Sequence, residues 1–210
     1  MIDTIICIYW LVTYSLLYFG FNISVKNTAM LGAFIHATLT SAYSAIILST
    51  LGINFFRYNS LGEIIITKIS LWYFIYDIIY LLIFNFDIIY LIHHLCAITA
   101  FYYILSLNYG ISVCMITLFL GEISNPFRLA KQMIYEHNIT TYNILNFLFS
   151  WIFIIARCPL MTYYGYIIHK DFIRHLPENN IKIILYSSIG IGLLGSYYWS
   201  YLLIKKKFFN

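Results

Sequence analysis

The sequence predicts an all-α, polytopic membrane protein with about seven transmembrane helices. Hydrophobic residues make up 62% of the 210 residues and charged residues only 10%, and the mean hydropathy is +0.82. A soluble domain needs about a quarter of its residues charged to cover its surface, so the solvent of this chain must be largely lipid. The apolar runs are continuous and lack the alternation of barrel strands, which favours helices, because helices bond every backbone group within hydrocarbon.

Several segments approach the roughly 20 apolar residues that a spanning helix needs: 2–21, 30–53, 63–85, 87–106, 110–131, 141–168 and 181–204. The first lacks a basic start and a small-residue cleavage site, so we expect a retained helix rather than a signal peptide. The third and fourth nearly touch at Asn85–Asp87, which predicts a tight hairpin with Asp87 capping the following helix. Pro126 and Pro159 are expected to kink their helices.

The charged residues predict an orientation and give no nucleic-acid surface. The net charge is +4, and the basic residues are dispersed except for Lys205–Lys207, which we interpret as a cytosolic anchor or a solubilising tail. We call the N-terminal side of the first helix side A and the opposite side B. Side B holds six basic residues against five on side A, so the positive-inside rule places side B and the C-terminus in the cytosol. The sequons at Asn22 and Asn138 fall on side B and should stay unused.

A layer of polar side chains is predicted at one depth of the bilayer. With a helical rise of 1.5 Å per residue, these residues lie roughly 9–14 Å inside side B: His36, Asp77, His93, His94, Glu122, Asn125 and Asn146. Polar groups within a membrane are costly and by default indicate function. The layer therefore predicts a polar chamber nearer side B than the midplane. The structural alternative is that these side chains only join neighbouring helices.

The residues of this layer suit acid–base or nucleophilic chemistry. A neutral imidazole acts as general base or nucleophile near neutral pH. Asp77 is the best carboxylate to orient it, because the tight hairpin joins its helix to that of His93 and His94. Adjacent helical residues diverge by about 100°, so one histidine should reach the substrate and the other should orient or bind. Metal binding ranks third, since no H-x-x-x-H pair puts two ligands on one face.

Other features receive structural interpretations. Lys68 is expected to snorkel to side A, and Arg157 is expected to form an internal hydrogen bond. The G-x-G-x-x-G match at 190–195 lies inside the predicted seventh helix rather than after a strand, so we interpret its glycines as positions of close helix packing. The four cysteines lie in apolar runs without C-x-x-C spacing and are expected to be free thiols.

Five blocks resemble the TLC domain in order and spacing: FIHATLTSAYS (34–44), ISLWYFIYDIIYLL (69–82), DIIYLIHHLCAITAFYYIL (87–105), LGEISNPFRLAKQM (120–133) and IFIIARCPLM (152–161). This is the family of the ceramide synthases and the translocating-chain-associating membrane protein. The resemblance implies an endoplasmic-reticulum or other endomembrane location, and a six-helix core around a lipid-sized tunnel. It divides the chain into an N-terminal helix and loop (1–29), the TLC-like domain (30–204) and a basic cytosolic tail (205–210).

In ceramide synthases the histidine pair transfers an acyl group from acyl-CoA to a sphingoid amine. The resemblance therefore implies a catalytic role for His93 and His94, with Asp77 in support. One block departs from the synthases, which carry a closely spaced pair of aspartates where this chain has Glu122, Ser124, Asn125 and Pro126. The E-x-S-x-P-F pattern is similar to TLC-domain-containing proteins outside the synthase branch.

Two hypotheses follow for the function. The first is a protein of lipid metabolism that binds an acyl lipid in the chamber and, if it is an enzyme, transfers an acyl group from acyl-CoA to an amine or hydroxyl acceptor. Polar parts of the substrate would then bind to His36, Glu122, Asn125 and Asn146. The second is a non-enzymatic regulator of membrane lipid composition. Neither involves a metal or a resident cofactor, and the expected partners are membrane lipids and acyl-CoA. A transporter is less favoured, because no inverted pair of broken, Gly-rich helices is seen.

Overall fold

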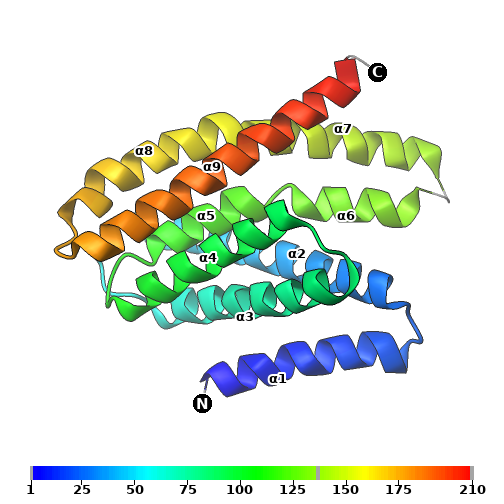
Figure 1. Ribbon diagram of the computed structural model, residues 1–210, viewed down its shortest axis with the longest axis horizontal. Helices are drawn as coiled ribbons and strands as arrows, with labels where there is room; N and C mark the ends of the chain where they lie inside the picture. The colour runs from blue at the N-terminus through cyan, green and yellow to red at the C-terminus, as the bar shows by residue number, and fades with distance from the viewer. Residues whose placement is uncertain (1, 136–137, 209–210) are drawn as a thin grey trace.

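The computed structural model describes residues 2–135 and 138–208, of which 206–208 only as backbone. In order, the elements are α1 (Ile2–Ser15), η1 (Leu16–Gly20), α2 (Val25–Leu51), α3 (Leu61–Phe84), α4 (Ile88–Ser106), α5 (Ser112–Glu122), α6 (Asn125–Ile134), α7 (Ile139–Ile155), η2 (Ala156–Leu160), α8 (Met161–Asp171), η3 (Ile173–His175) and α9 (Asn179–Phe208). The elements η1 and η2 are π-helical turns, and η3 is a 3₁₀ turn. The long helices run back and forth between the two ends of an elongated bundle (Figure 1).

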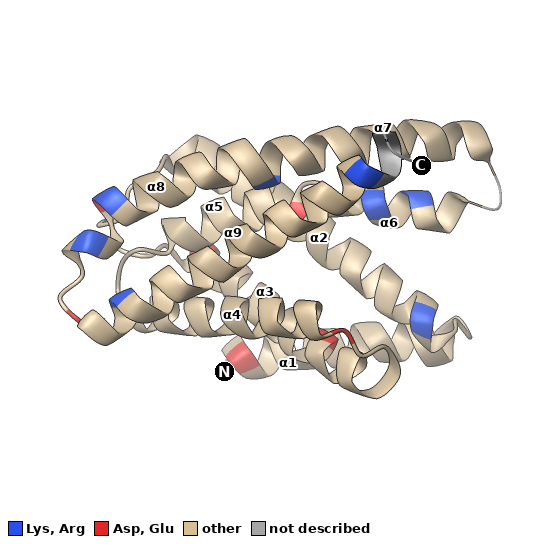
Figure 2. Ribbon diagram, turned by 45° about the horizontal axis from the view of Figure 1, so that its top comes forward, with Lys and Arg blue, Asp and Glu red and all other residues tan. Residues whose placement is uncertain are grey.

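The predicted fold class is confirmed. Within the described ranges, six stretches are long and apolar enough to cross a membrane: Ile2–Gly20, Val25–Leu51, Leu61–Phe84, Ile88–Ser106, Ile139–His175 and Asn179–Lys205. Figure 2 shows most Lys, Arg, Asp and Glu near the two ends of the bundle, with long uncharged stretches between them. That distribution suits a bundle whose middle lies in hydrocarbon.

The predicted fifth segment, 110–131, is divided into two shorter helices. Helix α5 ends at Glu122, and α6 begins at Asn125 with a proline in its first turn. Pro126 lacks a backbone N–H and could not continue the hydrogen bonding of α5. The break leaves carbonyl groups at the end of α5 without helical partners, and it lies beside the predicted polar layer.

Side-chain caps fix where the spanning helices begin. The predicted hairpin at Asn85–Asp87 is present, and the Asp87 carboxylate accepts hydrogen bonds from the backbone N–H groups of Ile89 and Tyr90. Ser60 and Glu63 form a capping box at the start of α3. Such reciprocal caps satisfy backbone N–H groups that no helical carbonyl reaches. The hairpin therefore holds α3 and α4 side by side.

Helix α1 packs along α3 at the edge of the bundle (Figure 1). The fully buried Trp10 donates its indole N–H to the Ile69 carbonyl at 3.1 Å. Lys68, expected to snorkel, forms an ion pair of 2.6 Å with Asp3 on α1. These contacts secure the first helix to the rest of the chain.

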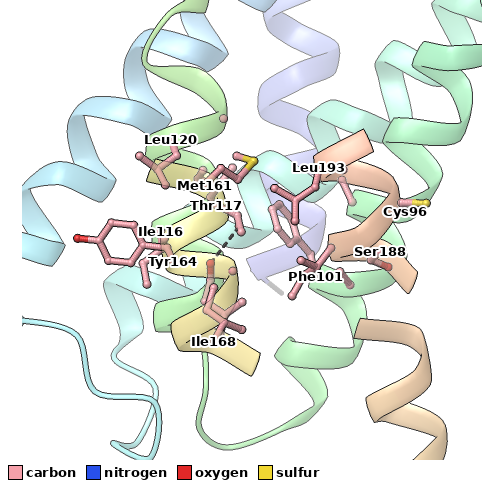
Figure 3. A pocket seen from close by; sticks show the side chains of 18 of the residues that line it. Cys96, Phe101, Ile116, Thr117, Leu120, Met161, Tyr164, Ile168, Ser188 and Leu193 are labelled. Carbon is pink, nitrogen blue, oxygen red and sulfur yellow. Dashed lines mark hydrogen bonds between the residues drawn. The ribbon is translucent and has the colours of Figure 1, made fainter. Parts of the chain in front are cut away.

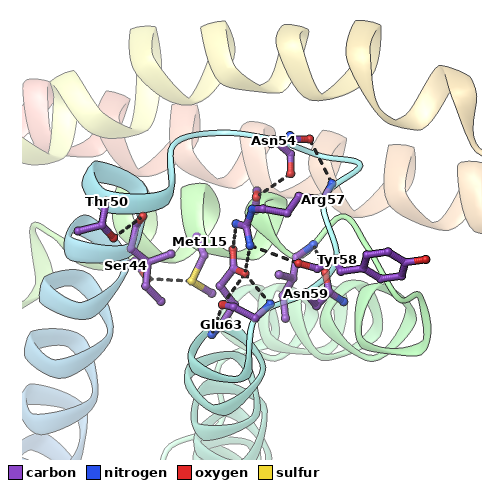
Figure 4. Close-up of polar contacts among 12 residues, drawn as sticks. Ser44, Thr50, Asn54, Arg57, Tyr58, Asn59, Glu63 and Met115 are labelled. Carbon is purple, nitrogen blue, oxygen red and sulfur yellow. Dashed lines mark hydrogen bonds and ion pairs between the residues drawn. The ribbon is translucent and has the colours of Figure 1, made fainter.

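A partly buried ion pair lies at side A, at the start of α3 (Figure 4). The guanidinium of Arg57, in the α2–α3 connection, contacts both carboxylate oxygens of Glu63 at 2.8 and 3.0 Å, and the Glu63 side chain is fully buried. The α4–α5 connection lies next to it, and its Gly110 adopts φ +90°. A Cβ at Gly110 would lie 2.3 Å from the ring of Phe172, so this position requires glycine.

The prediction that the glycines of α9 permit close helix packing is wrong for this fold. A Cβ at Gly190 or Gly192 would meet no heavy atom within 4 Å, and one at Gly195 would meet only Trp199 of the same helix. The space beside Gly192 belongs to a cavity described below. The predicted basic tail begins within α9, which extends to Phe208, while residues 209–210 lie outside the described ranges.

Candidate functional site

A chamber of about 350 Å³ with several polar side chains lies toward side B, among the helices α2–α7 and α9 and the turn η2. It is lined by five of the predicted site residues, Asp77, His93, His94, Glu122 and Asn125. Other polar and aromatic side chains complete its wall: Tyr73, Tyr90, Arg128, Arg157 and Trp199. The chamber brings together residues from segments far apart in the sequence, as the common depth predicted.

The α3–α4 hairpin places His94 against Asp77. The Nδ1 atom of His94 lies 3.2 Å from the Asp77 carboxylate, yet this nitrogen forms no aligned hydrogen bond. The contact is therefore close but angled away from the direction of the ring N–H. His94 is almost fully buried, and its ring stacks on Phe74 at 5.0 Å. These neighbours hold His94 in place and leave it little contact with the open space.

His93 faces a different environment. Its ring meets the indole of Trp199 edge to face, with centroids 5.6 Å apart and an interplanar angle of 85°. Trp199 also packs on Tyr90 at 5.1 Å. His93 is more exposed than His94, and it is the histidine that lines a second cavity as well as the chamber. The two histidines therefore diverge, as expected for adjacent residues of a helix.

A hydrogen-bonded series of side chains follows the α5–α6 break. The Asn125 amide donates to Glu122 Oε2 at 2.8 Å, and Arg128 Nε donates to Asn125 Oδ1 at 3.3 Å. Glu122 is buried and Arg128 partly exposed. The series therefore joins the inner part of the chamber to its more open part. If α5 continued without the break, Asn125 and Arg128 would lie along a different helix axis.

A second, apolar cavity of about 130 Å³ adjoins the chamber and lies nearer side A. Its wall contains Phe101, Ile116, Met161, Ile168 and Leu193, whose side chains gather around one space in Figure 3. Along α4 the lining runs from position 93 to position 104, which corresponds to roughly 16 Å of helix. The cavity is thus narrow, apolar and elongated along the bundle.

The chamber and the apolar cavity share one wall. The residues that line both are Phe74, His93, Glu122 and Arg157. Arg157 lies in the π-helical turn η2 just before Pro159, and its Nη2 donates to the Gly121 carbonyl at the end of α5. The expected internal hydrogen bond of Arg157 is therefore confirmed. π-helical turns within α-helices often occur at functional sites.

Two predicted site residues do not line the chamber. His36 is 1% exposed, stacks on Tyr73 at 3.9 Å, and has its Nε2 at 3.2 Å from Ser70 Oγ. Asn146 accepts a hydrogen bond of 2.6 Å from Lys131. His36 thus lies behind Tyr73 and Phe74, which line the chamber, and Asn146 lies outside its lining.

The side chains that sequence reasoning missed are Tyr90, Arg128 and Trp199. Each resembles an ordinary residue of a membrane interface, where aromatic and basic side chains are common, so no separate signal identified them. Among the described residues, no three His, Cys, Asp or Glu side chains are grouped as metal ligands would be.

The protein-family model of the TLC domain matches residues 27–205 of the chain. The chain belongs to the TLC-domain family. The matched region contains every residue of the chamber and of the apolar cavity, whereas α1 precedes it. No curated protein and no solved structure matches the chain. The family and the membrane-spanning helices together make it an integral membrane protein related to lipids.

Proposed function

We propose that this TLC-domain protein binds an acyl lipid across the two cavities and transfers an acyl group from acyl-CoA to an amine or hydroxyl acceptor. The observation that carries the proposal is the shared wall at His93. An apolar cavity suits an acyl chain, and an adjoining polar chamber suits the groups that react. A chain in the apolar cavity would have its carbonyl group beside His93.

In this mechanism His93 is the general base. It accepts the proton of the acceptor N–H or O–H group while the acceptor atom attacks the thioester carbonyl. The new C–N or C–O bond replaces the C–S bond, and the departing thiolate receives the proton from the His93 imidazolium. His94, held by Phe74 and Asp77, would position the acceptor and support the charge on its neighbour.

The remaining predicted residues receive roles that fit their places. Glu122 and Asn125 would bind the polar part of the substrate in the chamber. His36 would support the chamber wall through Tyr73, and Asn146 on α7 would hold Lys131 of α6 in place. We further propose an endomembrane location, such as the endoplasmic reticulum, with side B and the C-terminus in the cytosol, so that acyl-CoA reaches the chamber from the cytosol.

The experiment is an acyl-transfer assay with purified protein in lipid nanodiscs, labelled acyl-CoA and a panel of amine and hydroxyl lipids. Wild type should release labelled product, and His93→Ala should lower kcat by about 10²–10⁴-fold, the usual contribution of a general base. His169→Ala is the matched control, because His169 is exposed on side A, outside both cavities. Equal product from wild type and His93→Ala would overturn the enzymatic proposal.

A non-enzymatic lipid-binding regulator is the second candidate. It is favoured because Asp77 lies against His94 and, among the described residues, no carboxylate forms an ion pair with His93, the proposed base. A base is normally oriented by a well-directed hydrogen bond. This candidate predicts that an acyl lipid co-purifies with wild type, without turnover, and is lost when the apolar cavity is filled. A preparation free of bound lipid, with unchanged membrane lipids on expression, would count against it.

A further inference from the structure

The Arg157 side chain carries a buried positive charge that the proposed proton transfers do not use. The residue is 6% exposed. Within the described part of the chain no carboxylate forms an ion pair with it. Glu122 lines the same two cavities, but its Oε2 accepts from Asn125. Charged side chains within a membrane are costly unless they are paired or serve a function.

The hydrogen bonds of Arg157 leave part of its guanidinium group free. Nη2 donates to the Gly121 carbonyl, while Nε is buried without an acceptor. The side chain borders both cavities. The ring of Phe153 lies 5.4 Å from the guanidinium carbon and packs against it. The hydrogen bond to Gly121 and the Phe153 ring fix the orientation of the guanidinium group. This leaves an N–H donor without a protein acceptor where the two cavities meet.

We propose that Arg157 binds the oxygen atom of the acyl carbonyl and stabilises the negative charge that this oxygen gains during transfer. The inference rests on the proposed acyl chemistry at His93. When the acceptor attacks, the carbonyl π electrons move to oxygen, and they return when the C–S bond breaks and the thiolate leaves. A fixed donor in a site with little water is the usual means of stabilising such an oxyanion. Arg157 is then a catalytic residue in addition to its structural bond with Gly121.

The pairing of this arginine with a broken helix supports the assignment. The α5–α6 break frees the Gly121 carbonyl, which holds one guanidinium nitrogen. The π-helical turn η2 shifts the side chains of its helix relative to a regular α-helix, and Arg157 lies in that turn. Two irregularities in separate helices therefore meet at one buried side chain, on the wall where the cavities join.

The first test is a binding experiment that does not depend on turnover. Purified protein in detergent is titrated with palmitate and with hexadecanol, which share a chain and differ in charge at the oxygen-bearing end. Wild type should prefer palmitate. Arg157→Gln, which retains a donor for Gly121, should lose that preference while binding hexadecanol as before, and Arg157→Lys, which retains the charge, should fall between them. Lys26→Gln is the control, because Lys26 is exposed and borders neither cavity.

The second test is kinetic and separates this inference from the proposed function. In the acyl-transfer assay, Arg157→Gln should lower kcat by about 10²–10³-fold, as loss of an oxyanion donor does, with KM little changed. Millimolar guanidinium should restore part of kcat in Arg157→Ala, and the same concentration of urea should not. Absence of turnover in wild type would refute the transferase but not the carboxylate preference. Equal loss of palmitate and hexadecanol binding in Arg157→Gln would assign Arg157 a purely structural role and overturn the inference.

Discussion

Replacing Gly192 by leucine tests whether the apolar cavity holds an acyl chain. A Cβ at this position would meet no heavy atom within 4 Å, and Gly192 lines the cavity, so a leucine side chain would extend into the space proposed for the acyl chain. Its side chain adds about four carbon atoms, and burial of each methylene is worth about 0.8 kcal/mol. A long chain that can no longer pass should therefore lose at least about 3 kcal/mol, or roughly 200-fold in affinity.

The assay is a titration of the purified protein with fatty acids of increasing length. Gly190→Leu is a matched control, because a Cβ at Gly190 would also meet no heavy atom within 4 Å, but Gly190 borders neither cavity. Both changes replace a helical glycine by a better helix former, so their effect on helix stability is similar. Long chains should bind more weakly to Gly192→Leu only, and chains too short to reach position 192 should bind normally. Equal effects of the two variants, or a loss independent of length, would show that the acyl chain does not lie beside Gly192.

Three further predictions concern the frame of the site. Arg57→Met should lower the free energy of unfolding by about 3 kcal/mol, because it leaves the buried Glu63 carboxylate without its partner; an unchanged unfolding transition in detergent would contradict this. Gly110→Ala should cost about 2 kcal/mol or more, since alanine is strained at positive φ and would overlap Phe172; a thermal midpoint equal to that of wild type would show that the loop adapts. Neither native sequon should be glycosylated when the protein is expressed in endoplasmic-reticulum membranes. An endoglycosidase-sensitive form would place side B in the lumen.

The helices were predictable because lipid imposes a simple requirement of length and apolar composition. The Asn85–Asp87 hairpin and its cap were also evident from the sequence. The division of the fifth segment was not, because α5 and the start of α6 form one mostly apolar run, and the expected effect of Pro126 was a kink. The polar residues from Glu122 to Arg128 are the feature that marks a break here.

The sequence predicted the depth of the site residues in the membrane but not the direction in which each side chain points. A rise of 1.5 Å per residue gives the height of a side chain along its helix, and this brought His93, His94 and Asp77 to one level. It does not give the rotation of each helix about its axis. His36 is therefore at the right depth but faces Tyr73 and Ser70, and Asn146 faces Lys131. The contacts that decide these directions come from neighbouring helices, which a single sequence does not specify.

The role of the glycines in α9 was predicted wrongly because the sequence does not give the rotation of this helix either. Glycines in a membrane helix commonly allow two helices to approach, and periodicity alone cannot distinguish that role from an opening. In this fold, Gly192 lines the apolar cavity instead. Arg157 is the opposite case, since its internal hydrogen bond was expected, while its place between two cavities depends on the break after α5.

The most direct test of acyl-chain binding in the apolar cavity is to locate a bound chain. A fatty acid with a diazirine at its methyl end is bound to the purified protein, photolysed and mapped by peptide mass spectrometry. A chain bound in the apolar cavity should form cross-links at the side A end of that cavity, to Ile168, Ile173 or Leu185, and these should be lost in Gly192→Leu. Cross-links confined to outward-facing residues such as Tyr166 and Leu194, unchanged by Gly192→Leu, would contradict binding in this cavity.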